Sequence, residues 1–262
     1  DLPEGVDCAT SMERNAIVEK AIAAVLRGEA ENDDFNKLIL AADISPQAVL
    51  WIRAWFRYLR QTGVTYGIAT VVEALGRAPA ATKALVDVFQ ALHDPKLETN
   101  RDGAVDRARA AFEDALQSVS SIDDDRILRL MRSLVEATLR TNAFSPAASL
   151  ALAMKINSSR VPGLPAPVPW REIWVYSPRV EGIHLRYGKI ARGGLRWSDR
   201  RDDFRTEILG LMKAQLVKNA VIVPTGAKGG FYPKQLPPAS NRDAWFAEGT
   251  ESYRTFIRAL LS

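Results

Sequence analysis

The sequence predicts a protein of the α+β to α/β class, with an all-helical part at residues 1–145 and a truncated α/β part with a mixed sheet at residues 146–262. Apolar residues recur at helical spacing through the first part, whereas the second part alternates short β-branched segments with Pro and Gly. Charge divides at the same place. Residues 1–145 hold 17 Lys and Arg against 22 Asp and Glu, and residues 146–262 hold 18 against 9, which together give a net charge of +4.

Helices are expected one after another in the first part. Ser45 and Pro46 mark the clearest helix start, as N-cap and first helical residue, and Gly63 marks the end of that helix. The three consecutive Asp residues at 123–125 suit a helix N-terminus, where the helix dipole favours negative charge. Further helices are predicted at residues 11–26, 66–75, 78–92, 102–116 and 123–139. Four aromatic residues after Pro46 are expected to form core: Trp51, Trp55, Phe56 and Tyr58.

The second part is expected to alternate strands with helices. Strands are predicted at residues 148–156, 172–176, 182–187 and 220–223, the last of them leading into a glycine loop. A Pro-rich connection occupies residues 161–169, and Gly193 with Gly194 suits a turn between strands. Helices are predicted from Asp199 or Asp202 to about Asn219 and from Arg242 to Leu261. Because the last helix reaches the end of the chain without a capping glycine, we expect the chain to be a piece of a longer protein.

Composition argues against several functional classes. No run of about 18 apolar residues exists, so neither a membrane-spanning helix nor a membrane partner is expected. The single cysteine, Cys8, excludes an internal disulfide and suits a cytoplasmic location. Because the chain has only this cysteine and two histidines, His93 and His184, we expect no metal site. The basic residues of the second part are dispersed, which favours a small anion over nucleic acid as a partner.

Three cationic residues beside or near glycines stand out in the second part. Arg192 precedes Gly193 and Gly194, Lys218 ends the predicted long helix, and Lys228 lies in the run GAKGG at residues 226–230. Glycine on a tight backbone lets N–H groups and a cation converge on one carboxylate. The three cations therefore predict a site for a small anion.

Each of these lysines has more than one interpretation. At about 100° per residue, Lys218 lies at the rim of the apolar arc of its helix, whereas Lys213 lies on the polar side and is expected to be solvated. Lys218 can face a ligand or pair with the negative end of the helix dipole. Lys228 can carry a proton in a poorly solvated site or belong to a surface turn. His184, within a predicted strand, is expected to be structural.

Two nucleotide-binding motifs are absent from the sequence. The GAKGG run lacks the four-residue gap, the Gly-Lys pair and the following hydroxyl residue of a phosphate loop. No G-x-G-x-x-G fingerprint occurs elsewhere in the chain. Neither a phosphate loop nor a dinucleotide-binding turn is therefore predicted.

The spelling of these motifs resembles the glutamate dehydrogenase family, most closely its very large NAD-dependent bacterial branch. The resemblance lies in residues 176–231 and includes the runs YSPRVEG (176–182), RGGLRWSDRR (192–201), DFRTE (203–207) and KNAVIVPTGAKGG (218–230). It implies a helical domain at residues 1–145 followed by the N-terminal part of a substrate-binding catalytic domain at residues 146–262. The helical part is far less diagnostic.

The resemblance also implies roles for individual residues. The lysine of the Gly-x-Lys-Gly-Gly run is catalytic in this family, and that position is Lys228. The lysine before asparagine binds the α-carboxylate of the substrate, and that position is Lys218. Arg192 stands where smaller members carry a lysine that binds the side-chain carboxylate, which keeps the charge and changes its reach. Three glycines complete the implied substrate site: Gly193, Gly194 and Gly229.

The implied reaction is the oxidative deamination of L-glutamate to 2-oxoglutarate and ammonia. A hydride passes from Cα to NAD, water adds to the resulting imine, and Lys228 polarises the developing carbonyl. The catalytic aspartate and the NAD-binding domain are expected downstream of the 262 residues, so the chain alone is expected to be inactive. The whole enzyme is expected to be a cytoplasmic homo-oligomer.

Two other interpretations stay open. A related dehydrogenase acting on a monocarboxylic amino acid would need only one carboxylate clamp, so loss of Arg192 would barely matter. A helical assembly or regulatory module with a residual anion site would not depend on Lys228. A nucleic-acid binder is the least favoured class, and its affinity would fall steeply with salt.

Overall fold

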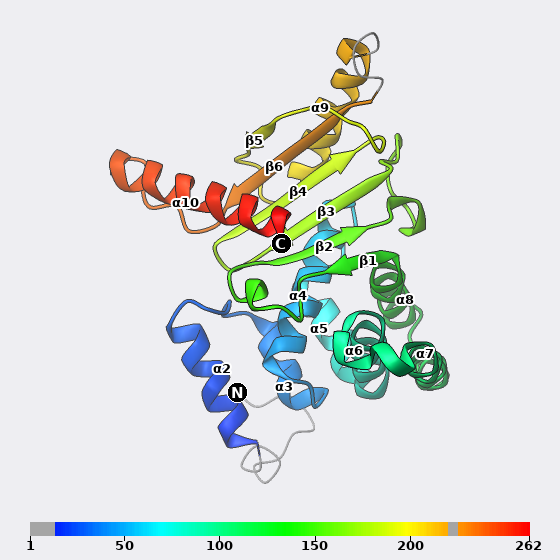
Figure 1. Cartoon of the computed structure of the whole chain (residues 1–262). Helices are drawn as coiled ribbons and strands as arrows, with labels where there is room; N and C mark the ends of the chain where they lie inside the picture. Colours follow the sequence, from blue (N-terminus) through cyan, green and yellow to red (C-terminus); the bar gives the residue numbers. More distant parts are fainter. Residues whose placement is uncertain (1–13, 220–224) are drawn as a thin grey trace. The chain divides into compact units, whose positions relative to one another are not determined.

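A computed structural model of the chain describes residues 14–219 and 225–262 and divides into two compact units (Figure 1). Of the described residues, unit 1 comprises 14–56 and 65–136, and unit 2 comprises 57–64, 137–219 and 225–262. Unit 1 is helical and unit 2 contains a mixed six-stranded sheet, which confirms the predicted fold class. The domain boundary at residue 145 stays a prediction, because compact units and evolutionary domains need not divide a chain at the same residue.

The helices of unit 1 form where apolar residues recur at helical spacing. Helix α4 begins as predicted, with the amide of Ala48 donating to the hydroxyl of Ser45 at 3.1 Å, and the chain turns away at Gly63, whose φ is +97°. The acidic residues 123–125 lie in the first turn of their helix, as expected. The helices are α2 (Asn15–Leu26), α3 (Leu38–Ala41), α4 (Pro46–Gln61), α5 (Ile68–Arg77), α6 (Pro79–His93), α7 (Arg101–Leu116) and α8 (Ile122–Ala137).

Aromatic packing forms the centre of unit 1. The rings of Trp51 and Trp55 lie 4.9 Å and 5.2 Å from the ring of Phe89 on α6, and Phe56 packs against Phe35 at 5.4 Å. All of these side chains are at most 3% exposed. The prediction that the aromatic residues after Pro46 are core is therefore confirmed.

The sheet of unit 2 has the order β1-β2-β3-β4-β6-β5. Neighbouring strands are antiparallel except β5 and β6, which are parallel and are connected by helix α9 (Phe204–Asn219). The strands are β1 (Thr138–Thr141), β2 (Leu152–Ile156), β3 (Arg171–Tyr176), β4 (Val180–Arg186), β5 (Leu195–Trp197) and β6 (Ala227–Pro233). Short 3₁₀ helices complete the chain at η1 (Asp34–Lys37), η2 (Pro95–Asn100), η3 (Pro146–Ser149) and η4 (Ser158–Arg160).

Helices cover both faces of this sheet. Helix α10 (Arg242–Leu261) lies on one face (Figure 1). Its Phe256 packs against Phe231 at 5.8 Å and lies where a β-carbon on Gly182 would stand. On the other face, Trp174 stacks on Phe204 of α9 at 5.9 Å. Tyr58, in the last turn of α4, meets the same tryptophan edge-on at 5.9 Å. The two faces of the sheet thus pack against different helices.

The structure differs from the sequence analysis at three places, and a fourth predicted segment lies outside the described residues. The helix predicted at 123–139 ends at Ala137, and Thr138–Thr141 forms a strand because it pairs with β2. Strand β5 was not predicted, since only its pairing with the distant β6 holds its three residues extended. The run at 226–230 is largely strand rather than a glycine loop. The strand predicted at 220–223 lies outside the described residues.

No helix within the described residues is long and apolar enough to span a bilayer.

Candidate functional site

Parallel pairing at the edge of the sheet brings the two glycine motifs together. The backbone of Arg192 forms a parallel β-bridge with the backbone of Gly226, and Leu195 of β5 lies opposite Gly229 of β6. The amide of Ala227 donates to the carbonyl of Arg192 at 3.0 Å, and the amide of Gly229 donates to the carbonyl of Gly194 at 3.1 Å. This register places Gly193 and Gly194 beside Ala227 and Lys228, although 34 residues separate Gly194 from Lys228 (228 − 194 = 34).

Lys228 lies in β6, flanked on both sides by neighbouring backbone. Leu185 of β4 is its antiparallel partner, and the extension of β5 runs along its other side. A β-carbon built on Gly194 would lie 3.7 Å from the Nζ atom of Lys228. The half-buried lysine therefore extends its amine over a residue that has no side chain of its own, which leaves space beside the amine for a further group.

The glycines around Lys228 allow close approach between strands. A β-carbon on Gly193 would overlap the carbonyl oxygen of Ala227. One on Gly229 would overlap the side chain of Leu195 and lie 3.0 Å from His184 Cδ2. Neither position needs a positive φ. The expected turn at 193–194 is therefore wrong: these residues run alongside β6, and at Gly193 a side chain would force the two backbones apart.

The strand structure also limits how an anion can be held. The amides of Ala227 and Gly229 already donate within the sheet, so they do not converge on a carboxylate as the loop interpretation assumed. Side-chain cations must provide most of the attraction for an anion at this edge.

The other two predicted cations are Arg192, just before β5, and Lys218, near the end of α9. Arg192 is exposed, and its amide donates to the carbonyl of Thr225 at 3.4 Å. Lys218 lies in the last turn of α9, and its side chain falls outside the described residues. Lys213 is exposed, as predicted. The structure brings Gly193, Gly194, Lys228 and Gly229 together, and the functional roles of all six residues stay predictions.

A buried ion pair lies in the same row of the sheet as Lys228. Glu172 on β3 is opposite Leu185, which is opposite Lys228, so the three residues share one face, with Glu172 about 10 Å from Lys228 at strand spacing. Arg205 of α9 donates to the Glu172 carboxylate at 2.6 Å and 2.9 Å, and the hydroxyl of Tyr58 lies 3.2 Å from it. Burial, reinforced by the Glu172 charge, raises the pKa of Tyr58 well above its usual value.

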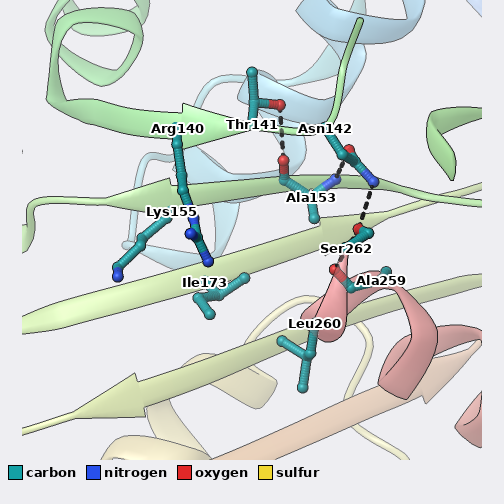
Figure 2. Close-up of a pocket in the computed structure, with 9 residues that line it drawn as sticks. All are labelled: Arg140, Thr141, Asn142, Ala153, Lys155, Ile173, Ala259, Leu260 and Ser262. Carbon is teal, nitrogen blue, oxygen red and sulfur yellow. Dashed lines mark hydrogen bonds between the residues drawn. The ribbon is translucent and has the colours of Figure 1, made fainter. Parts of the chain in front are cut away.

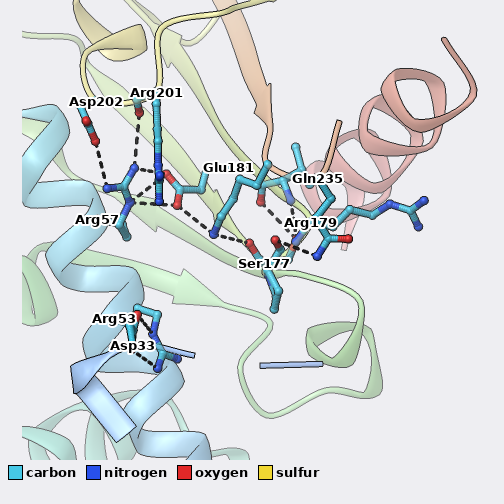
Figure 3. A network of polar contacts seen from close by, with 12 residues as sticks. Asp33, Arg53, Arg57, Ser177, Arg179, Glu181, Arg201, Asp202 and Gln235 are labelled. Atoms are coloured by element: carbon cyan, nitrogen blue, oxygen red, sulfur yellow. Dashed lines mark hydrogen bonds and ion pairs between the residues drawn. The ribbon is translucent and has the colours of Figure 1, made fainter. Parts of the chain in front are cut away.

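A second buried carboxylate, Glu181, joins α4 to the sheet (Figure 3). Arg57 donates to it at 2.9–3.2 Å, and the ammonium of Lys234 lies 3.1 Å away. Arg57 also reaches Asp202 at 3.1 Å. Burial opposes the charge of Arg57, but Glu181 outweighs it and raises the pKa of the guanidinium. The two carboxylates therefore hold the last turn of α4 and the start of α9 against the face that carries Lys228.

Sequence reasoning missed these two networks. Glu172 and Glu181 are fully buried, although each stands within a strand that is otherwise largely apolar. An acidic residue in such a strand is a usable signal, because a buried carboxylate requires a partner. The partners themselves lie 33 to 124 residues away and cannot be identified by spacing.

His184 lies on the opposite face of β4 from Lys228's row. Burial, with a smaller contribution from the charge of Arg186, lowers its pKa to about 4. The imidazole is therefore neutral at neutral pH. Within the part of the chain that the structure describes, no group of three or more His, Cys, Asp or Glu side chains could hold a metal ion.

Comparison with known proteins shows which family the chain resembles. Residues 111–262 match the family described as bacterial NAD-glutamate dehydrogenase, catalytic domain, and residues 30–95 match glutamate dehydrogenase, helical motif 3. The chain is 50% identical over 255 residues to the NAD-specific glutamate dehydrogenase of Mycobacterium tuberculosis, covering 92% of this chain and 16% of the relative. It is 46% identical over 248 residues to the enzyme of that name from Halomonas elongata, covering 92% and 15%, and 44% identical over 265 residues to that of Pseudomonas aeruginosa, covering 98% and 16%.

Proposed function

Since the chain belongs to the family of bacterial NAD-glutamate dehydrogenases, we propose that it forms part of an enzyme that converts L-glutamate to 2-oxoglutarate and ammonia. The chain spans 15–16% of the length of these three relatives. The observation that carries the proposal is the β5–β6 pairing, which sets Lys228 over Gly194 beside the start of the Arg192 motif.

Lys228 is the proposed catalytic residue. Its amine extends from a strand fixed by neighbours on both sides, so its position is set by the sheet rather than by a mobile loop. A positive amine there would stabilise the negative charge that develops on the substrate oxygen when water adds at Cα. The space above Gly194 lets that oxygen approach the amine.

Arg192 and Lys218 are the proposed carboxylate ligands. A dicarboxylate needs two cationic partners, and the guanidinium of Arg192 offers a planar fork that matches one carboxylate. The exposed position of Arg192 at the start of the β5–β6 pair leaves its side chain accessible to a ligand. Gly194 would complete the substrate site by keeping a side chain out of it, and Gly193 and Gly229 would support it by letting β5 and its extension approach β6 closely.

NAD would supply the hydride acceptor, and we propose that a domain outside this chain binds it. The residues of this chain would then bind and orient the substrate, so that the 262-residue chain alone would not turn over glutamate. A cytoplasmic location and a homo-oligomeric state also stay predictions.

The proposal is tested with the intact protein that contains this chain. We expect NADH oxidation that requires both 2-oxoglutarate and ammonium, and a much lower kcat/KM with a 2-oxo monocarboxylate of the same chain length. Replacement Arg192→Ala should raise the KM for 2-oxoglutarate by tenfold or more, with Arg192→Lys as the conservative control.

Other outcomes identify the alternatives. Equal rates with the monocarboxylate, together with an Arg192→Ala variant of normal KM, would indicate a related amino-acid dehydrogenase. Absence of turnover with any of these substrates would contradict the enzymatic proposal and favour an assembly or regulatory module.

A further inference from the structure

The α10-side face of the sheet consists of two chemically different halves. One half is apolar and packs under α10, where Ala153, Val175, Val180 and Phe231 of the sheet form a cluster with Phe256 of the helix. The other half carries four cationic residues on four adjacent strands, β1 to β4, which we name the basic patch: Arg140, Lys155, Arg171 and Arg186. Arg140 is exposed and the other three are half-buried.

The strand register sets like charges directly against each other. Arg140 of β1 is opposite Lys155 of β2, and Arg171 of β3 is opposite Arg186 of β4. Lys155 is opposite Ile173, which lies two residues from Arg171 on the same face, so the two pairs are adjacent. Directly opposed residues have β-carbons about 5 Å apart, and like charges in that position destabilise a sheet.

The cations of the basic patch have no carboxylate partner among the described residues. Arg171 donates to the side-chain oxygen of Asn157 at 2.8 Å and to the carbonyl of Trp170 at 2.6 Å, and Arg186 donates to the carbonyl of Lys189 at 2.7 Å. These acceptors are neutral, so they orient the guanidinium groups without balancing their charge. The opposite face differs, because Arg57 and Arg205 are each paired there with a buried carboxylate.

A cavity of about 80 Å³ opens beside two of these cations, between the sheet and the last turn of α10. In Figure 2 the side chains of Arg140 and Lys155 extend from neighbouring strands on the same side of the sheet. Hydrogen bonds fix the adjacent wall, where Asn142 donates to the hydroxyl of Ser262 at 2.9 Å and to the carbonyl of Ala151 at 3.0 Å. The cavity has room for a group of several non-hydrogen atoms.

The electrostatics of Lys155 agree with this geometry. Burial, followed by the charges of Arg140, Arg171 and Arg186, lowers the pKa of its ammonium. An anion bound among these groups would offset the repulsion that the lowered pKa reports.

We propose that the basic patch binds a small multivalent anion through phosphate or carboxylate oxygens, on the face of the sheet opposite Lys228. The guanidinium groups of Arg140, Arg171 and Arg186 are planar, and each can donate two parallel hydrogen bonds to two oxygens of one carboxylate or phosphate. The small size of the cavity favours a compact anion over a charged polymer. The site does not depend on the proposed dehydrogenase reaction, because the two lie on opposite faces.

Calorimetric titration of the intact protein tests this proposal. Pyrophosphate and citrate serve as separate probes at low ionic strength, and each is also titrated into the Arg192→Ala variant, which removes a proposed carboxylate ligand of the substrate site and leaves the basic patch unchanged. We expect at least one probe to bind, and Lys155→Gln with Arg140→Gln to weaken that binding by tenfold or more. Binding of pyrophosphate alone would identify phosphate as the preferred chemistry, and binding of citrate alone would identify carboxylate.

Lys213→Gln is the matched control, because Lys213 is an exposed lysine on α9 at the other face of the sheet. An equal loss of affinity in Lys213→Gln, or an unchanged affinity in the Lys155 and Arg140 double variant, would overturn the proposal, as would no binding of either probe. A second readout is the melting temperature without anion. It should rise in the double variant because two opposed cations are removed, and a fall would contradict the account.

Discussion

The Nζ atom of Lys228 lies over Gly194, 3.7 Å from the position that a β-carbon on that glycine would occupy. The two residues belong to different motifs, 34 positions apart in the sequence, and meet because β5 and its extension run parallel to β6. Contact between this amine and this glycine is the geometric basis of the proposed catalytic site.

Enlarging Gly194 tests that basis. Gly194→Val would place methyl groups where the Lys228 amine and its ligand must lie, so we expect kcat/KM of the intact enzyme to fall by about 100-fold or more. Gly194→Ala is the control, because its single β-carbon would make only ordinary contact with Nζ. Near-normal kcat/KM in Gly194→Val would show that the space above residue 194 is not used.

Gly193 tests the strand pairing rather than the chemistry. Its β-carbon would overlap the carbonyl oxygen of Ala227, so Gly193→Ala should lower the free energy of unfolding by about 1–3 kcal/mol through separation of β5 from β6. Gly210→Ala is the matched control, since Gly210 lies within α9 with open space around it and should gain about 0.5–1 kcal/mol. Urea denaturation measures both, and equal effects would argue against the close approach.

The buried pair of Arg205 and Glu172 predicts a non-additive response. Arg205→Met leaves the Glu172 carboxylate buried without its partner and should cost about 3–5 kcal/mol of unfolding free energy. The double variant Arg205→Met with Glu172→Leu removes both charges and should be less destabilised than the single variant. If the two substitutions add, the pair is not coupled as the hydrogen bonds indicate.

Two half-buried histidines predict how stability depends on pH. Burial, with Arg186 and Arg101 respectively as the smaller causes, lowers the pKa of both His184 and His93 from 6.5 to about 4. Between these values the unfolded chain binds protons that the folded chain does not. The stabilising contribution of the two neutral histidines is therefore fully present above about pH 6.5. It is lost as the pH falls toward 4, by about 3 kcal/mol of unfolding free energy for each histidine at most.

Single substitutions separate the two contributions. Urea denaturation of His184→Gln and of His93→Gln at pH 7.5 and pH 5 should each show a smaller loss of stability on acidification than the unsubstituted protein. An unchanged loss in both variants would assign the acid sensitivity to carboxylates instead.

Local signals predicted much of this structure. The start of α4 at Ser45 and Pro46, the core position of Trp55 and the exposure of Lys213 follow from capping preference and helical periodicity, which depend on nearby residues only. The residues of the motifs between 176 and 231 predicted the family. These properties share one cause, because each is determined within a short stretch of chain.

Long-range pairing accounts for what the sequence could not predict. β5 has three residues and becomes a strand only beside β6, and the same pairing turns the GAKGG run from an expected loop into a strand. The partners of Glu172 and Glu181 lie on α4, on α9 and just after β6, at separations that carry no periodic signal. The glycines were singled out because they would let a cation and backbone N–H groups converge on a carboxylate, whereas in the structure Gly193 and Gly229 permit close approach between β6 and the chain beside it.

The most direct test of the central claim is the rate of NADH oxidation by the intact enzyme with 2-oxoglutarate and ammonium, after the substitution Lys228→Ala. Lys213→Ala serves as the control for loss of an exposed lysine. If Lys228 is the catalytic residue, kcat should fall by several orders of magnitude in Lys228→Ala, with an unchanged unfolding transition, and stay normal in Lys213→Ala. A Lys228→Ala enzyme that retains kcat within tenfold of the unsubstituted protein would contradict the account.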